Sequence, residues 1–523
     1  MFLDKHIKTT GVNMKKIVSL SVMAAAATSF AFGSTADDIA NLQAQIDKLK
    51  VKQGKINAQS ANDNIKWGVD FRTAYDNINY DMADGSSVGN DSLLSMRLWL
   101  NMAYAPDSHN VFKGQLSMNK AFGADFGTAN NKTRALSMGG MFDWTGNEAL
   151  TDNSLKVRQA YWLYLGDKAF GADIPWTFSI GRRPSTTGFL ANLREDDAAQ
   201  SPLGHIINVE FDGLSSKLDL SNVTGVAGMS FKVCLGYGAT NAEPLFTGPT
   251  PYADTENNLD DIKLGGFIFE PYNDGQFIVK ATWFKAWDLP GQQSPMNPEF
   301  DGNFHQFGDM QGAALSVLVD GLTEDGYFAD AKVFGSFAWS KSMPFAGQMM
   351  MGSPDDETGT SWWIGANLPV GEGAEYGTFG AEYNHGSQYW RPFTYAEDTM
   401  IGSKVAARGD AWEAYYTYQI NDALSLQARY TDISYDYTGS NGFFGNYSGA
   451  SIKIDDIKAG AAGFDQMAAA GVIQHQDPAG IIGDLMGAGL TQAQAQGMLM
   501  AKGMSSQVVE KAQDFRIYLR YRF

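Results

Sequence analysis

The sequence predicts an all-β protein: a transmembrane antiparallel β-barrel of about sixteen strands, preceded by a short N-terminal coiled-coil helix. Three observations support this prediction. Segments of about ten residues alternate apolar and polar side chains along most of the chain, as expected for strands with one face toward lipid and the other toward water. The chain also begins with a segment typical of export and ends with a strand-like segment that has an aromatic terminus.

Residues 1–33 have the features of a cleaved signal peptide. A pair of lysines precedes an apolar run over 17–30, and small residues follow it. The run is too short to cross a bilayer as a stable helix, so an inner-membrane anchor is the weaker alternative. We expect translation to start at Met14 and cleavage to follow Gly33.

The composition narrows the class of protein. The chain has 57 glycines and its mean hydropathy is -0.25, which argues against a helical membrane protein and leaves a barrel as the membrane fold. Cys234 is the single cysteine, so no intramolecular disulfide can stabilise the fold. The net charge of -19 argues against nucleic-acid partners and suggests acidic, solvated loops that attract cations.

Residues 34–60 predict a periplasmic coiled coil. Apolar side chains recur at spacings of three and four, with Gln53 in the remaining seam position, at Ile39, Leu42, Ile46, Leu49 and Ile56. Because so short a helix is marginal alone, we expect it to associate with copies of itself, which points to a homotrimer. A surface helix or a flexible tether is the alternative.

Residues 61–523 predict the outer-membrane barrel. In the first strand Trp67, Val69 and Phe71 share an apolar face, while Asp70 and Arg72 lie on the other. A soluble β-sandwich or propeller is disfavoured, because aromatic residues gather toward the strand ends as in a membrane-interface belt. We place strands near 65–76, 92–105, 111–121, 155–166, 174–182, 211–220, 228–239, 261–270, 275–287, 311–320, 328–340, 360–368, 376–385, 409–420, 423–437 and 514–523.

The C-terminal ten residues form the sharpest strand pattern. One face carries Phe515, Ile517, Leu519, Tyr521 and Phe523, and arginines occupy the other. This ending resembles the closing strand of outer-membrane barrels. The resemblance implies that the barrel-assembly machinery recognises Phe523 as an assembly signal.

The segment 439–513 departs from the strand repeat and predicts a long helical last loop. Thr491 and Gln494 have the spacing of a capping box, which marks the start of a helix. The apolar stripe of this loop needs burial, so we expect it to enter the lumen as a plug or to cap the mouth. A partly disordered loop is the alternative.

Strand parity directs a set of basic side chains into the lumen. This predicted basic wall contains Arg72, Arg97, Arg158, Arg429, Arg516 and Arg520. The third long loop, roughly 183–210, contains Arg194, Glu195, Asp196 and Asp197, and its position resembles the constriction loop of general porins. We therefore expect these acids to face the basic wall across a narrow channel. The alternatives are solvated lumen charges without a selective role, and an exposed acidic loop that binds divalent cations near lipopolysaccharide.

The run from Ile180 to Gly188, followed by Asn192 to Glu195, resembles a sequence block of an uncharacterised porin-like outer-membrane protein family of epsilon-class bacteria. The resemblance covers nearly all of the mature chain and implies a barrel in contact with outer-membrane lipid and lipopolysaccharide, with no known substrate. The run is also similar in plan to phosphate-selective porins. We find no dense lysine set, however, and so expect no anion selectivity.

The sequence favours a porin or channel for diffusion of small hydrophilic solutes. A structural or adhesive barrel with a plugged lumen is the alternative, and inward arginines disfavour a fatty-acid transporter. Enzyme activity is not expected, because the six histidines show no recognisable pairing with a nucleophile or carboxylate. No cofactor or metal motif is found.

Overall fold

The computed structural model describes residues 65–124, 150, 153–183, 187–241, 250–251, 253, 260–293, 304–394, 399–440, 442 and 449–523. The predicted signal peptide at 1–33 and the predicted coiled coil at 34–60 lie outside these residues. The trimer that the coiled coil suggests therefore stays a prediction.

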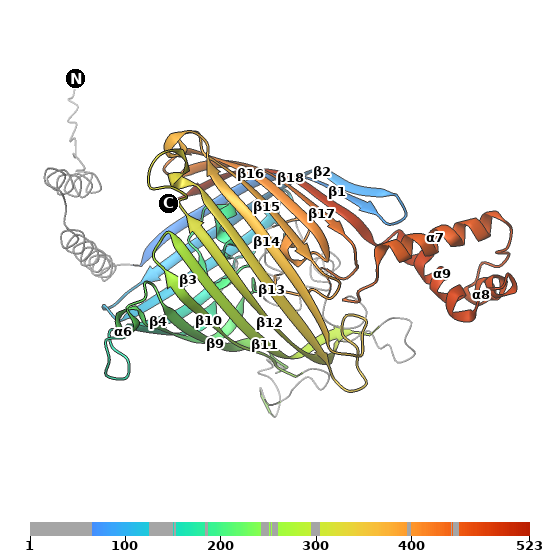
Figure 1. Cartoon of the computed structure of the whole chain (residues 1–523), viewed down its shortest axis with the longest axis horizontal. Helices are drawn as coiled ribbons and strands as arrows, with labels where there is room; N and C mark the ends of the chain where they lie inside the picture. Colours follow the sequence, from blue (N-terminus) through green and yellow to red (C-terminus); the bar gives the residue numbers. More distant parts are fainter. Residues whose placement is uncertain are drawn as a thin grey trace, which may run out of the picture. The chain divides into compact units, whose positions relative to one another are not determined.

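Sixteen of the strands in the described residues form one closed antiparallel barrel (Figure 1). Its strands are β1 (Lys66–Met82), β2 (Ser87–Tyr104), β3 (Asn110–Ala121), β4 (Lys156–Gly166), β5 (Trp176–Arg183), β8 (Phe211–Asp219), β9 (Ser230–Ala239), β10 (Ile262–Asn273), β11 (Phe277–Gln292), β12 (Phe304–Asp320), β13 (Lys332–Pro344), β14 (Glu357–Pro369), β15 (Thr378–Gly386), β16 (Gly409–Asn421), β17 (Leu424–Tyr435) and β18 (Val509–Arg522). The predicted barrel and its strand number are confirmed.

The barrel closes because its first strand has partners on both sides. β1 pairs with β2 and, at the other edge, with β18, so no strand edge is left open. The last residue exchanges two backbone hydrogen bonds with Val69: Val69 N donates to Phe523 O at 3.1 Å, and Phe523 N donates to Val69 O at 3.0 Å. An even number of strands therefore brings both ends of the barrel to one rim.

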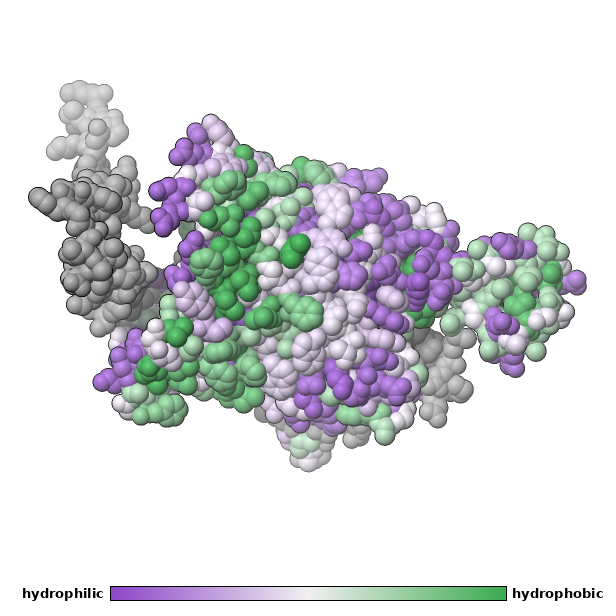
Figure 2. Space-filling view, in the orientation of Figure 1, coloured by the Kyte–Doolittle hydropathy of each residue, from purple (hydrophilic) through white to green (hydrophobic). Residues whose placement is uncertain are grey.

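Strand alternation separates the two faces of the barrel wall. In β1, Asp70, Arg72, Ala74 and Asp76 are buried, whereas the residues between them are partly exposed. Large apolar side chains are exposed on the outward faces of other strands, as with Phe337, which is 54% exposed. Figure 2 shows apolar residues gathered over the strands on the visible face. The wall thus has a polar interior and an apolar exterior.

Several strands extend beyond the predicted limits at one end. β1 continues to Met82 and β2 begins at Ser87, where the sequence suggested strand ends near 76 and 92. The turn between them contains Gly85 with a φ of 83°, a left-handed conformation that glycine adopts without strain. At this end of β1 the alternation is inverted: Ile78 and Met82 are buried on the inward face and Asn77, Asn79 and Asp81 lie on the other, so the pattern that marks a lipid-facing strand is lost.

The connections differ at the two ends of the barrel. One end has tight turns and three short helices, α6 (Ser221–Thr224), η1 (Tyr327–Asp330) and η2 (Glu372–Ala374). The other end has the long connections, which contain β6 (Gly188–Phe189), α5 (Ala191–Glu195), β7 (Gln200–Leu203) and η3 (Lys404–Ala406). No helix in the described part of the chain is long and apolar enough to cross a membrane.

The last long connection forms three helices at the barrel rim (Figure 1). They are α7 (Ile454–Ala469), α8 (Pro478–Gly487) and α9 (Gln492–Ser505). The predicted capping box is confirmed, because the Thr491 hydroxyl accepts from the Gln494 N–H and the Gln494 side chain accepts in return. Ile481 and Leu485 are buried among the three helices themselves, so the apolar stripe does not enter the lumen.

Candidate functional site in the barrel lumen

The connection between β5 and β8 folds into the barrel instead of over its rim. Its residues Leu190, Leu203 and Ile206 are completely buried and pack against inward side chains of β11 to β14, such as Phe284 and Trp363. These contacts place the loop in the lumen. We call residues 187–210 of this connection the inner loop.

Helix α5 of the inner loop has strained ends. Leu190 precedes it with a φ of 78°, and Asp196 follows it with a φ of 50°. Residues other than glycine rarely adopt this left-handed conformation, which costs about 1–3 kcal/mol for each residue. The surrounding contacts must offset this strain, and they do so through charged side chains on the barrel wall.

Glu195 at the end of α5 is the centre of these contacts. Its carboxylate accepts from Arg429 Nη1, Arg194 Nε and the Tyr518 hydroxyl, each at 3.0 Å, and it lies 3.7 Å from Arg72 Nη1. All five side chains are buried. A single loop carboxylate therefore joins β1, β17 and β18.

The two aspartates that follow meet the last strand. Asp197 Oδ1 accepts from Arg520 Nη2 at 2.8 Å, and Arg520 Nε donates to Asp70 at 3.0 Å. Asp196 pairs with Arg522 at 2.7 Å, but the Asp196 side chain is 73% exposed. Asp197 is thus part of the buried network, whereas Asp196 lies at its solvent-exposed edge.

A second connection also folds inward and shares this network. Lys404, in the connection between β15 and β16, donates to Glu413 at 2.5 Å and lies 2.6 Å from Glu382. Arg194 of the inner loop lies 3.4 Å from Glu413. The two connections are hydrogen-bonded to each other, since Phe393 N donates to Ile206 O at 2.9 Å.

Three further arginines of the predicted basic wall also point inward and are buried. Arg97, on the same strand as Trp99, and Arg158, on β4, lie 3.5 Å and 4.1 Å from the Trp99 ring centroid. Arg158 lies 3.4 Å from Glu210, and Arg516 Nε donates to an Asp76 oxygen at 2.5 Å. These three arginines therefore have carboxylate or aromatic partners at contact distance. Arg97 in turn lies 3.4 Å from Asp70.

The structure brings the predicted loop acids and wall arginines together, but the distances between them are shorter than in a constriction across an open channel. In such a constriction, water would separate the acids from the bases. Here they are at hydrogen-bond distance, so this side of the lumen is filled by ion pairs. We call this network of inner-loop acids and the arginines of β1, β17 and β18 the charged cluster.

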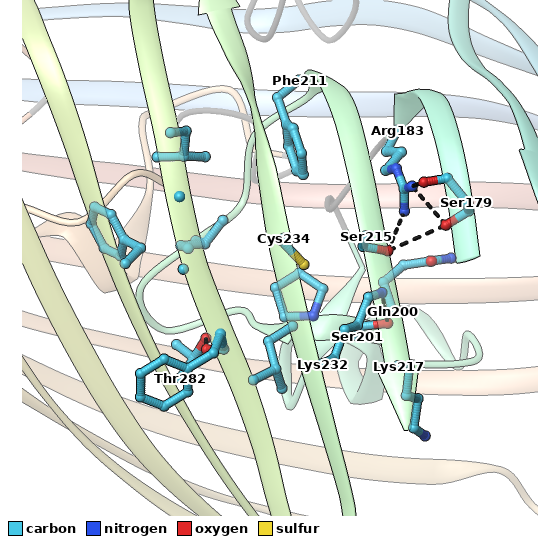
Figure 3. Close-up of a pocket in the computed structure, with 18 of the residues that line it drawn as sticks. Ser179, Arg183, Gln200, Ser201, Phe211, Ser215, Lys217, Lys232, Cys234 and Thr282 are labelled. Carbon is cyan, nitrogen blue, oxygen red and sulfur yellow. Dashed lines mark hydrogen bonds between the residues drawn. The ribbon is translucent and has the colours of Figure 1, made fainter. Parts of the chain in front are cut away.

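The opposite side of the lumen contains a cavity of about 270 Å³ beside β4, β5, β8, β9, β10 and β11. Figure 3 shows Arg183, Lys232 and Lys217 around it, from three successive strands of the wall. Sequence analysis missed this basic group and found no dense lysine set. The signal was present, because Lys217 and Lys232 have inward parity on strands that the sequence predicts to be neighbours.

The described residues contain no group of three or more His, Cys, Asp or Glu side chains arranged to hold a metal ion. Near the rim, His385 Nδ1 lies 2.8 Å from Asp410. His205 is buried in the inner loop between the hydroxyls of Ser336 and Ser361, at 2.8 Å and 2.9 Å. These serines hold the imidazole in place and connect the inner loop to β13 and β14.

A closed antiparallel barrel with an apolar exterior, a polar interior and loops folded into its lumen is the architecture of porin-type β-barrels of the outer membrane. The protein belongs to this class, and its location is the outer membrane. Residues 87–477 match the model of a family described as "Protein of unknown function (DUF3373)". The chain is therefore a member of that family.

Three solved structures have a fold similar to that of this chain. OmpT of Vibrio cholerae is 13% identical, with 88% of this chain and 97% of that chain covered and a TM-score of 0.41. The anion-selective porin of Comamonas acidovorans is 11% identical, with coverages of 88% and 99% and a TM-score of 0.43. OmpF of Salmonella typhi, in complex with daunomycin, is 12% identical, with coverages of 89% and 99% and a TM-score of 0.42. No curated protein matches the sequence.

Proposed function

We propose that this protein is a diffusion channel for small hydrophilic solutes. The main observation behind the proposal is that the inner loop fills one side of the lumen and leaves the other side open. The inner loop occupies the side of β1 and β11 to β18, and a cavity lined by both polar and apolar side chains remains beside β4 to β11. Solutes would pass on this free side, selected by the width and charge of the lining. The proposal includes no catalytic step.

The test is a conductance measurement on the refolded full-length chain in planar bilayers. Folding is first checked by heat-modifiable migration in gel electrophoresis. A steady current that is proportional to voltage and rises with salt concentration is the expected result. A correctly folded barrel that conducts no current would overturn the proposal.

A structural or adhesive barrel with a plugged lumen is the second candidate. It is favoured by one observation, the anchoring of the inner loop on two sides. Apolar residues hold it to β11 through β14, and the charged cluster holds it to β1, β17 and β18. This candidate predicts that the folded barrel conducts no current in the same measurement.

A further inference from the structure

The basic cavity beside β5, β8 and β9 contains like charges placed opposite each other. Lys217 of β8 and Lys232 of β9 are direct cross-strand partners, and both face inward. Like charges at directly opposite positions destabilise a sheet. Lys232 is also within electrostatic range of Arg183 and of Lys280, although Lys280 has its own counter-charge in Glu270 at 3.6 Å. A folded barrel with this arrangement gains stability from any anion that enters the cavity.

The charged cluster also places like charges opposite each other on neighbouring strands, but there the protein supplies its own counter-charges. Arg72 lies in register between Arg97 and Arg520 on three neighbouring strands. There the carboxylates of Glu195 and Asp197 enter from the inner loop and pair with the arginines. The basic cavity has no such counter-charge, because the described residues that line it include no Asp or Glu.

Among the described residues, the hydrogen-bond partners of Lys232 and Arg183 are neutral groups. Lys232 Nζ donates to the Ser201 hydroxyl at 2.8 Å, and Arg183 donates to the hydroxyls of Ser179 and Ser215 at 2.6 Å and 2.8 Å. Within the described part of the chain, the buried Nε of Arg183 has no hydrogen-bond partner. Lys217 has no hydrogen bond or ion pair among these residues, and the like charges of Lys232 and Lys280 lie within its electrostatic range. Donors of this kind are satisfied by a carboxylate.

The remaining lining is apolar. It includes Phe211, Phe284, Leu264 and Ile268. A few polar groups in a mainly apolar pocket select a ligand that has both kinds of surface. An inorganic anion would leave this apolar surface unused, whereas a small organic acid uses the cations and the apolar lining together.

We propose that the cavity is a binding site for small organic carboxylates that cross the channel, with Lys217, Lys232 and Arg183 holding the carboxylate and the apolar lining holding the carbon skeleton. This inference rests on the proposed function and names its solute class. The sequence alone led us to expect no anion selectivity. We now infer a site for anions because the register of β8 and β9 places Lys217 directly opposite Lys232.

The first experiment measures binding of benzoate to the refolded full chain in detergent by isothermal titration calorimetry. Lys217→Gln removes one charge without removing a described partner, so its barrel should fold as the parent does. The control is Lys168→Gln, which removes the same charge from an exposed turn outside the cavity. We expect benzoate affinity to fall about tenfold in Lys217→Gln, the effect of losing one charge-assisted contact, and to stay unchanged in the control.

Equal affinity of the parent and Lys217→Gln, or no benzoate binding by the folded parent, would overturn the inference. A parallel titration with inorganic phosphate tests the apolar part of the site. Phosphate that binds as tightly as benzoate would contradict an organic carboxylate as the ligand.

Reversal potentials in a sodium benzoate gradient separate this inference from the proposed function. A conducting channel in which Lys217→Gln does not lower benzoate permeability leaves the proposed function intact and overturns the inference. A barrel that binds benzoate but conducts no current overturns the proposed function and leaves the binding site.

Discussion

Glu195→Gln should release the inner loop from the barrel wall. The substitution keeps the size of the side chain and removes its charge, so that Arg72, Arg194 and Arg429 lose the carboxylate they share. Breaking a buried ion pair by removing one partner costs about 3–5 kcal/mol. At about 3 kcal/mol the equilibrium between the docked and released loop changes about 150-fold toward release. The strained backbone at Leu190 acts in the same direction.

Two measurements detect this release. Trypsin cleavage after Arg194 should be absent in the folded parent, where Arg194 is 4% exposed, and present in Glu195→Gln. Single-channel records of the variant should also show larger or noisier conductance steps. The cleavage assay does not depend on whether the barrel conducts.

Asp196→Asn is the matched control. Asp196 neighbours Glu195 in the same loop, but its pair with Arg522 is solvent-exposed and contributes about 0–1 kcal/mol. Cleavage and conductance should therefore match those of the parent. If Glu195→Gln resists trypsin as fully as Asp196→Asn does, the charged cluster does not hold the loop and this reasoning is refuted.

Three further predictions concern the rim helices and assembly. The Asp484 carboxylate raises the pKa of His475 by accepting its hydrogen bond, so this contact stabilises the helices fully below the ordinary pKa of histidine and is lost as pH rises through the raised value. The protection of α8 amides from exchange, taken relative to the intrinsic exchange rate at each pH, should be lower at pH 9 than at pH 6, and Asp484→Asn should remove the difference. Thr491→Ala removes the capping box and should destabilise α9 by about 1 kcal/mol, measured as faster amide exchange in its first turn. Removal of Phe523 should lower the amount of heat-modifiable barrel in the outer-membrane fraction, and an unchanged amount would contradict its role as an assembly signal.

The wall of the barrel was predictable from the sequence because each strand carries its own signal. Alternation in segments such as 155–166 and 409–420 depends only on which side faces lipid, and every strand of the barrel contains it. The sixteen predicted segments match the sixteen observed strands. Strand ends such as Met82 were missed where the apolar residues change from the outward to the inward face and the outward face becomes polar.

The contents of the lumen were less predictable, because they depend on contacts between distant residues. The sequence directs Arg72, Arg429 and Arg520 inward and places Glu195 in the third long loop. It does not show that the loop enters the barrel far enough for direct ion pairs. That depth depends on apolar contacts such as Leu203 and Ile206 with inward side chains of β11 to β14, which lie more than sixty residues away.

The difference between the two sides of the lumen shows why net charge does not determine selectivity here. The chain carries a net charge of -19, yet the field in the lumen is set by the charges that have no counter-charge nearby. On the side of β1 and β18 the inner loop supplies its own carboxylates, so solutes meet a neutralised surface. On the side of β8 and β9 the cross-strand pair of Lys217 and Lys232 keeps its positive field. Glu195→Gln should consequently shift reversal potentials toward anions and Lys217→Gln toward cations, although both substitutions lie inside one acidic protein. An equal shift in Lys168→Gln, which changes the whole charge by the same amount as Lys217→Gln but outside the cavity, would mean that the whole charge of the chain, and not its local pairing, sets the selectivity.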